Sequence, residues 1–253
     1  KLKTLPEDAK KELAQTAFAF SADMLAVPNS GPQTEAFFCE ADETYFGGSA
    51  AGGKTFLLIL LALTKHKRSL LLRRYIDDAR AILEKTFEVI GNDRGLNRQL
   101  LQWRAPGPHI DFGGCQLETD KQRYKGDSHS LIGYDEAADF LESQVDFINI
   151  WNRSDDPKEK CRIVYASNPP LTAEGFWLIK KFAAWLDPKY PNPAKPGEIR
   201  WFLRREELEA EVDGAGPYDI GGEMIRATSR TFIRASLEDN PDYAHGTYKH
   251  RLH

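Results

Sequence analysis

Eight consecutive residues combine glycines, a lysine and a threonine at a spacing that suits anion binding. Residues 48–55 follow the phosphate-loop pattern G-x-x-x-x-G-K-T, and they are Gly48, Ser49, Ala50, Ala51, Gly52, Gly53, Lys54 and Thr55. Glycines allow the backbone to curl, so that successive N–H groups point at one anion. A helix that follows adds the partial positive charge of its N-terminus. We expect Lys54 to reach the β- and γ-phosphates of a nucleotide and the Thr55 hydroxyl to bind Mg²⁺.

Two adjacent carboxylates, Asp135 and Glu136, follow an apolar run over residues 130–134. By itself such a run is weak evidence, but it gains meaning from the glycine loop earlier in the chain. An acidic residue at a strand tip beside that loop can hold Mg²⁺, and a second one can orient or deprotonate the attacking water. We therefore assign the metal role to Asp135 and the water role to Glu136.

Small polar residues end another apolar run. Residues 161–166 are expected to form a buried strand, and Ser167 and Asn168 follow it before two prolines, which stop a strand sharply. Such residues, on a strand next to the metal strand, could sense whether a γ-phosphate is present. The alternative is an ordinary exit from strand to loop. Because this is the third expected strand that ends in polar groups, we favour the functional interpretation.

Gln33 precedes Phe37 and Phe38 and lies upstream of the glycine loop. A glutamine there could recognise the edge of an adenine base while an aromatic ring stacks on it. It could equally be a surface residue beside two core phenylalanines. Both interpretations stay open at this point.

Two arginines, Arg73 and Arg74, follow an expected buried strand over residues 69–72. The carboxyl ends of strands carry the ligand in doubly wound sheets, so these arginines could face phosphate, either of a nucleotide or of DNA. Pairing with Asp77 and Asp78 is the favoured alternative.

A polar and basic stretch, residues 119–126, leads into the strand that ends in the carboxylates. Arg123 or Lys125 could supply positive charge to a nucleotide that is bound by a neighbouring copy of the chain. The alternative is that both belong to a solvated loop.

The elements that position these groups alternate between strands and helices. A β-prone run precedes the glycine loop, and residues 56–63 are apolar on all sides, as in a helix buried against a sheet. Further helices are expected over residues 6–27, 77–90, 140–151, 174–186 and 240–252, further strands over residues 198–203 and 230–234, and a hairpin of short strands within residues 100–118. Residues 204–222 are charged and rich in glycine, which predicts an exposed loop.

This order predicts an α/β fold, in which a mostly parallel sheet is sandwiched by helices. We expect residues 1–170 to form a nucleotide-binding core. Residues 171–253 are expected to form a small C-terminal lid subdomain and the end of that core.

The overall composition is that of a soluble globular protein. The chain has 253 residues, of which 41% are hydrophobic and 28% charged, so it can form a sizeable core without disulfides. A net charge of −4 does not indicate nucleic-acid binding, so any such contact requires a local basic patch. Three cysteines without close pairing suit a reducing cytoplasm and argue against a disulfide framework or a zinc site. No signal peptide or membrane span is expected, and therefore no membrane partner.

Taken together and in order, the motifs resemble the ATPase half of the large terminase subunit of tailed bacteriophages. The resemblance covers nearly the whole chain. It is carried by Gly-Gly-Ser-Ala-Ala-Gly-Gly-Lys-Thr, Leu-Leu-Leu-Arg-Arg, Tyr-Lys-Gly, Leu-Ile-Gly-Tyr-Asp-Glu-Ala, Ala-Ser-Asn-Pro-Pro and Phe-Ile-Arg-Ala-Ser-Leu-Glu-Asp-Asn-Pro-Asp-Tyr. The glycine loop is shared by many NTPases, whereas Ser-Asn-Pro-Pro and the late Asp-Asn-Pro are much more specific.

The resemblance implies a P-loop NTPase of the RecA/ASCE type that works in a genome-packaging motor. Such proteins form rings, usually of five, on a portal protein, and act with a small terminase subunit. They hydrolyse ATP with Mg²⁺ to drive double-stranded DNA into a procapsid in the cytoplasm of the infected bacterium. By this resemblance, phosphate and Mg²⁺ are bound by Lys54 and Thr55, the metal by Asp135, the water by Glu136 and adenine by Gln33, while Ser167 and Asn168 form the coupling motif.

Two departures from that family stand out. Several relatives carry an arginine inside the glycine loop, where this chain has Ser-Ala-Ala-Gly. The cation for the transition state must then come from elsewhere, and Arg123, supplied to the next subunit, is our candidate. Relatives also carry a C-terminal nuclease of the ribonuclease H type. This sequence ends at the lid, so we expect no DNA cleavage from it and place a nuclease domain in the full-length protein.

Two other functions remain as alternatives. One is a helicase-like ATPase that acts on another nucleic acid or protein partner. The other is a switch that binds ATP with little turnover. Glu136 distinguishes the switch, because a module that only binds nucleotide has no need of a carboxylate that orients water.

Overall fold

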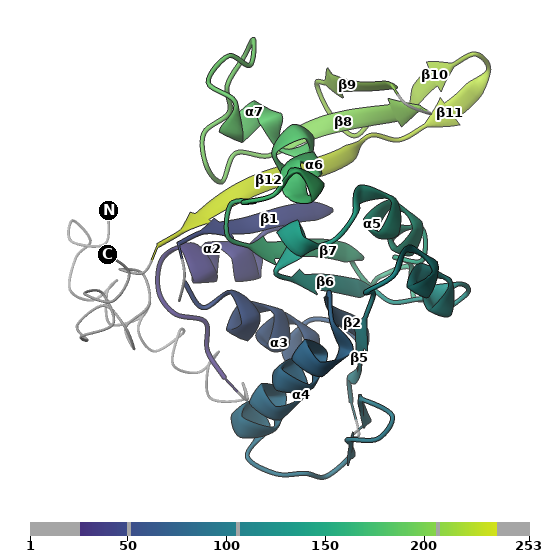
Figure 1. Ribbon diagram of the computed structural model, residues 1–253. Coiled ribbons are helices and arrows are strands. Elements are labelled where there is room, and N and C mark those ends of the chain that lie inside the picture. The colour runs from purple at the N-terminus through teal and green to yellow at the C-terminus, as the bar shows by residue number, and fades with distance from the viewer. Residues whose placement is uncertain (1–25, 50–51, 105–106, 206–207, 237–253) are drawn as a thin grey trace, which may run out of the picture.

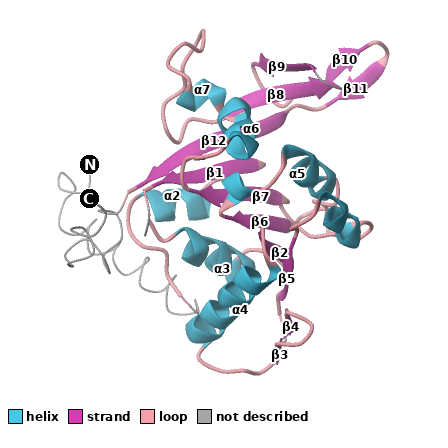
Figure 2. Cartoon of the chain, in the orientation of Figure 1, coloured by secondary structure: helices cyan, strands magenta, loops and turns pink. Residues whose placement is uncertain are grey.

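A ten-stranded sheet forms the centre of the protein, with helices on both of its faces (Figures 1 and 2). The computed structural model describes residues 26–49, 52–104, 107–205 and 208–236. Ala50 and Ala51 lie outside these ranges, as do the predicted helix over residues 240–252 and nearly all of the one over residues 6–27.

The strand order places the phosphate-loop strand near the middle of the sheet. The order is β3-β4-β5-β2-β6-β7-β1-β12-β8-β9. The strands are β1 (Glu43–Gly48), β2 (Arg68–Arg73), β3 (Leu96–Asn97), β4 (Gln102–Arg104), β5 (His109–Gly114), β6 (Leu131–Asp135), β7 (Arg162–Ser167), β8 (Arg200–Arg205), β9 (Leu208–Val212) and β12 (Thr228–Ala235). All neighbours from β5 to β12 are parallel, and the outer pairs are antiparallel. The prediction of a mostly parallel sheet is therefore confirmed.

Two groups of helices cover the sheet. One face carries α2 (Pro32–Phe38), α3 (Lys54–Thr64) and α4 (Ile76–Ile90), and the other carries α5 (Glu142–Asn149) and α6 (Phe176–Lys181), with α7 (Ala183–Leu186) beyond them (Figure 1). Because side chains alternate across a strand, Phe46 joins the core on the α3 side and Tyr45 the core on the α6 side. Residues 57–63 of α3 are all buried, as their uniformly apolar character predicts.

The C-terminal part of the chain supplies an antiparallel extension of the sheet and a core strand. Strands β8 and β9 extend the sheet as an antiparallel hairpin, and β10 (Tyr218–Ile220) and β11 (Glu223–Ile225) form a separate hairpin beyond it (Figure 1). The chain then returns as β12, which lies parallel to β1 with Phe46 opposite Ile233. Within the described ranges, no helix is both long enough and apolar enough to cross a membrane.

Two of the predicted elements are wrong. The stretch 204–222, predicted as a loop, contains β9 and β10. Strand β9 lies at the edge of the sheet and is largely exposed. Its residues 208–212 alternate between apolar and charged side chains, a pattern typical of a strand, within a stretch whose overall charge and glycines predicted a loop. Residues 115–118 were expected to be extended, but β5 ends at Gly114 and a 3₁₀ helix, η2 (Glu118–Tyr124), follows.

Candidate active site

The glycine loop joins the end of β1 to the start of α3, as its sequence predicts. Gly48 has φ of 149°, and a Cβ on it would lie 1.8 Å from the carbonyl oxygen of Ala235 in β12. The next residue, Ser49, donates its N–H to that same oxygen at 3.1 Å. Gly53 has φ of 73° and immediately precedes α3. Close backbone approach at one end and a left-handed residue at the other therefore explain why both ends of the loop are glycine.

The ammonium group of Lys54 is held at the centre of the site by two oxygens. It donates to the Ser49 carbonyl at 2.7 Å and to Oδ1 of Asn168 at 2.8 Å. Lys54 is buried, and burial lowers the pKa of its ammonium group, while the negative charges of Glu136 and Asp135 act in the opposite direction. A phosphate group would be a stronger partner for this cation than either of the neutral oxygens that hold it.

Asp135 is the last residue of β6 and only 1% of its side chain is exposed. The Thr55 hydroxyl lies 3.1 Å from Oδ1 and 3.0 Å from Oδ2 of this carboxylate. Hydroxyl and carboxylate oxygens are the ligands that Mg²⁺ prefers, and here they come together from the first turn of α3 and the tip of β6. Their donor chemistry fits Mg²⁺, the ion assigned to them from the sequence.

Glu136 follows Asp135 with φ of 55° and ψ of 54°, a left-handed conformation that is unfavourable for a residue with a side chain. Such a conformation costs roughly 1–2 kcal/mol, and it ends β6 abruptly. Burial raises the pKa of the Glu136 carboxyl group, and the neighbouring charge of Asp135 raises it further, while Lys54 and Arg73 oppose both effects. A half-buried carboxyl group with a raised pKa is a common feature of catalytic acids and bases.

The tip of β7 joins these groups. The Ser167 hydroxyl accepts a 3.2 Å hydrogen bond from the N–H of Ala138, in the short turn after Glu136. Asn168 binds Lys54 through its side chain and accepts a weaker bond, 3.4 Å long, from the Tyr45 hydroxyl through its carbonyl. Of the two residues predicted to form the sensor, Asn168 therefore contacts Lys54 of the glycine loop, and Ser167 contacts the turn that follows Glu136.

Gln33 lies against the glycine loop. Its amide donates to the Gly53 carbonyl at 3.0 Å and accepts from the N–H of Asn29 at 2.6 Å. Gln33 is 3% exposed, so the alternative of a surface glutamine is wrong. That alternative also placed two phenylalanines in the core, whereas Phe37 is buried and Phe38 is 47% exposed. The adenine contact stays a prediction.

Arg123 is not part of this cluster within one chain. It lies on η2, its side chain is 67% exposed, and it pairs with Asp120 at 3.1 Å. The Tyr124 hydroxyl anchors η2 to the Gly114 carbonyl at the end of β5, on the far side of β2 from the acidic pair. Its assignment as an arginine finger for a neighbouring subunit stays a prediction.

The two arginines at the end of β2 do not pair with the acids that were favoured from the sequence. Arg73 pairs with Asp135, and Arg74 hydrogen-bonds to the side chain of Gln144 in α5. Asp77 instead lies 3.6 Å from Arg80, within α4. The signal for Arg73, a buried strand that ends in basic residues, was present in the sequence, but its partner was not apparent.

Solved structures, and not sequence comparisons, show which fold carries this site. The sequence matches no family model, and none of the curated proteins matches it. Among solved structures, the Large Terminase ATPase domain of Thermus phage P74-26 has a TM-score of 0.53 and 14% identity, covering 93% of this chain and 92% of that one. A mutant of that domain gives the same TM-score and coverage at 13% identity. The fold is that of a phage large-terminase ATPase domain.

A third structure, the large terminase of a thermophilic bacteriophage in complex with ADP, is matched at 15% identity and a TM-score of 0.42 over 56% of this chain and 38% of that one.

In the terminase ATPase fold of this chain, β7 lies between the strand of the glycine loop and the strand of the acidic pair. This order brings Asn168 between Lys54 and the turn that contains Glu136.

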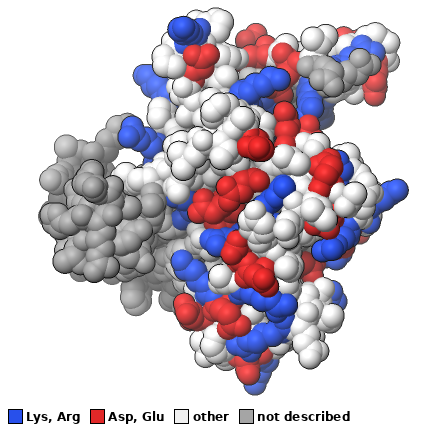
Figure 3. Space-filling model, in the orientation of Figure 1, with Lys and Arg blue, Asp and Glu red and all other residues white. Residues whose placement is uncertain are grey.

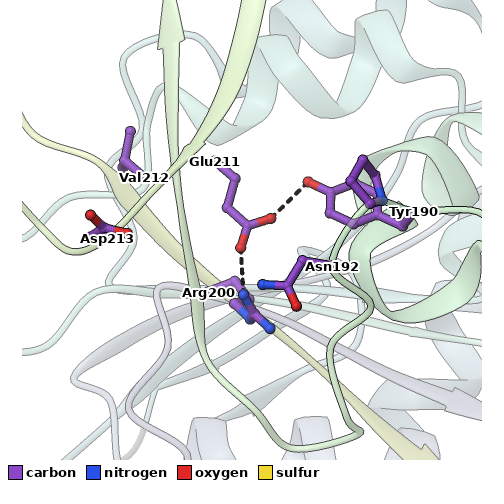
Figure 4. A pocket seen from close by; sticks show the side chains of 7 residues that line it. Tyr190, Asn192, Arg200, Glu211, Val212 and Asp213 are labelled. Atoms are coloured by element: carbon purple, nitrogen blue, oxygen red, sulfur yellow. Dashed lines mark hydrogen bonds and ion pairs between the residues drawn. The ribbon is translucent and has the colours of Figure 1, made fainter.

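A separate hollow of about 420 Å³ lies beside β8 and β9 (Figure 4). In it, Glu211 accepts a hydrogen bond from the Tyr190 hydroxyl at 2.9 Å and pairs with Arg200 at 2.7 Å. It contains none of the candidate residues described above. We therefore place the candidate active site at the glycine loop.

Proposed function

We propose that this chain is a Mg²⁺-dependent ATPase that powers the movement of double-stranded viral DNA into a procapsid. The observation that carries the proposal is the convergence of three strand ends. The loop after β1 contributes Lys54, which contacts Asn168 after β7, and α3 contributes Thr55, which contacts Asp135 at the end of β6. Cation, metal ligands and polar sensor thus meet beside one helix N-terminus, the arrangement that a triphosphate requires.

Each group has a role in this proposal. The loop N–H groups and Lys54 bind the phosphates, and Ser167 and Asn168 respond to the terminal one. Thr55 and Asp135 would hold Mg²⁺, which neutralises the negative charge of phosphate oxygens. Gln33 is assigned to the adenine side.

Glu136 orients the attacking water and accepts its proton. Its raised pKa suits this role, because a base works best when its pKa lies close to the working pH. General-base catalysis typically contributes 10²–10⁴-fold in rate. Glu136 is also the feature that favours an ATPase over a switch that only binds nucleotide.

The experiment that tests this proposal compares ATP binding with ATP hydrolysis in Glu136→Gln. We expect the affinity for ATP to stay within about threefold, and the hydrolysis rate to fall by roughly 10²-fold or more. Glu84→Gln is the matched control, because Glu84 is exposed and pairs only with Arg98 among the described residues. Normal hydrolysis by Glu136→Gln would show that the base is another residue.

The partners in this proposal are double-stranded DNA, a portal protein, a small terminase subunit, a nuclease domain and further copies of this chain in a ring of five. The setting would be the cytoplasm of an infected bacterium. The support is the fold likeness together with the motif resemblance. The face in Figure 3 carries acidic and basic side chains side by side, so it offers no continuous basic track for DNA on the described residues visible there.

A helicase-like ATPase is the second candidate, because the same core could drive strand separation. The two are distinguished by giving the assembled protein blunt linear duplex, closed circular duplex and a forked duplex. A packaging motor should hydrolyse ATP faster with duplex DNA and should leave the fork unopened. Strand separation that depends on ATP would favour the helicase.

A further inference from the structure

Arg73 forms an ion pair inside the candidate active site. Its Nε lies 2.8 Å and its Nη2 2.7 Å from Oδ2 of Asp135. The side chain of Asp135 is 1% exposed and that of Arg73 is 25% exposed. The carboxylate therefore has the Thr55 hydroxyl and the guanidinium of Arg73 as its polar partners.

The sheet fixes this pairing. Strands β2 and β6 are parallel neighbours with Leu72 opposite Tyr134, so Arg73 and Asp135 are the next residues of their strands and lie side by side. Arg73 also acts on the two other carboxylates in this region, since its charge opposes the effect of burial on the pKa of Glu136 and of Asp139. The guanidinium is thus an intrinsic cation of this site, supplied by the same chain.

A guanidinium paired with Asp135 and a metal ion bound by Asp135 compete for one carboxylate. Arginine stays protonated at all ordinary pH values, so a displaced Arg73 keeps its charge and needs another anion. Three anions are available: the carboxylates of Glu136 and Asp139 and the terminal phosphate of the nucleotide. The segment between Gly48 and Gly53 contains no basic residue, so the loop itself brings no cation before Lys54.

We propose that Arg73 is a cis-acting catalytic cation that exchanges partners, from Asp135 in the nucleotide-free protein to the γ-phosphate when Mg·ATP is bound. Arg73 would then keep the buried carboxylate neutralised when the site is empty, and would place positive charge on the terminal phosphate when it is filled. This inference rests on the proposed function, because it takes ATP as the substrate.

Arg73→Gln tests the exchange through binding. Dissociation constants are measured by calorimetry for ADP and for the non-hydrolysable triphosphate AMP-PNP, each with Mg²⁺. We expect AMP-PNP affinity to fall about tenfold or more, since a charge-assisted contact is lost, and ADP affinity to stay within about threefold. Arg74→Gln is the matched control, because Arg74 is the adjacent arginine but bonds to Gln144, and it should leave both affinities unchanged.

A second readout needs no nucleotide. Without the guanidinium, Asp135 should bind Mg²⁺ more readily, so Mg²⁺ alone should raise the melting temperature of Arg73→Gln by more than that of the unaltered protein. Arg73→Lys serves if Arg73→Gln does not fold. Lysine keeps the charge but lacks the planar fork, so we expect a loss of AMP-PNP affinity of severalfold with ADP affinity retained.

Two results would overturn the inference. Equal losses of ADP and AMP-PNP affinity would mean that Arg73 only holds Asp135 in place. Unchanged affinities, with either variant, would mean that Arg73 moves to a carboxylate, Glu136 or Asp139, or does not move. If the unaltered protein binds neither nucleotide with Mg²⁺, the proposed function itself fails, which is a separate outcome.

Discussion

The ammonium group of Lys54 donates a 2.8 Å hydrogen bond to the side-chain oxygen of Asn168, 114 residues further along the chain. This bond joins the glycine loop to the tip of β7. The Tyr45 hydroxyl in turn donates to the Asn168 carbonyl, so one asparagine connects β1, the loop and β7. A shift of Lys54 towards a bound phosphate would break or strain the hydrogen bond that ties it to the end of β7.

Asn168→Ala should uncouple nucleotide binding from turnover. The loop and Lys54 remain, so ATP affinity should change by less than about threefold, whereas hydrolysis should fall about tenfold or more because Lys54 loses one of the two oxygens that position it. Steady-state hydrolysis and calorimetric binding measure the two effects. Asn92→Ala, in the exposed turn after α4, is the control and should alter neither. Equal loss of binding and turnover would argue against a coupling role.

Gly48→Ala should disrupt the loop through backbone contact. A Cβ at this position would lie 1.8 Å from the Ala235 carbonyl oxygen, so β1 and β12 must separate. We expect a loss of about 2 kcal/mol or more in the free energy of unfolding, together with loss of ATP binding. Gly91→Ala is the comparison, since Gly91 has φ of 73° but open space around it, and its cost should be only about 1 kcal/mol. Denaturant unfolding gives both values, and equal losses would contradict the close approach.

The acid limb of the pH–rate profile should report Glu136. Its pKa is raised, and the base must be ionised to act, so kcat should decline at a higher pH than for an ordinary glutamate as the pH is lowered. The fold is not lost over the same pH range. Burial of the ionised Glu136 carboxylate lowers the free energy of unfolding at pH values above its raised pKa, and this destabilisation disappears as the pH falls through that pKa. Activity should therefore disappear while the melting temperature holds.

Asp139→Asn provides the check on that assignment. The charge of Asp139 raises the pKa of Glu136, so its removal should move the acid limb of kcat to lower pH. Because burial and Asp135 have larger effects, the shift should be a fraction of a pH unit. A limb that stays in place, or moves to higher pH, would mean that another group titrates.

Arg123 can be tested by mixing subunits. If Arg123 acts in trans, a ring that contains both Arg123→Ala and Glu136→Ala subunits should regain some turnover. It does so where the Arg123 of a Glu136→Ala subunit reaches the active site of an Arg123→Ala neighbour, which still has its Glu136. A trans arginine can be worth about 10³–10⁵ in rate, so even partial recovery is measurable. Arg73→Ala mixed with Glu136→Ala should show no recovery, because both changes affect the same site in cis. Absence of recovery with Arg123→Ala would remove it as the finger.

The local parts of this site could be predicted from the sequence, because each is encoded by adjacent residues. The glycine loop, the helix of α3 and the carboxylate pair are contiguous patterns, and their strand context follows from apolar runs. The partner of Arg73 could not be predicted in this way. Asp77 and Asp78 are near in sequence, whereas Asp135 is brought alongside only by the pairing of β2 with β6.

Strand β9 was missed for another reason. Its residues 208–212 alternate between apolar and charged side chains, which indicates a strand, but the charge and glycines of the whole stretch 204–222 favoured a loop. Gln33 is similar to Arg73, because its contact with Gly53 depends on how α2 packs beside α3. Contacts between elements that are distant in the chain, rather than the elements themselves, could not be predicted from the sequence.

A crystal structure of the chain with Mg²⁺ and AMP-PNP tests the central claim most directly. The account predicts that the β- and γ-phosphates lie in the loop formed by residues 48–53 and contact Lys54, with Thr55 and Asp135 beside the metal ion. A triphosphate bound elsewhere, such as in the hollow beside Tyr190 and Arg200, or a metal ion that does not touch the end of β6, would contradict it.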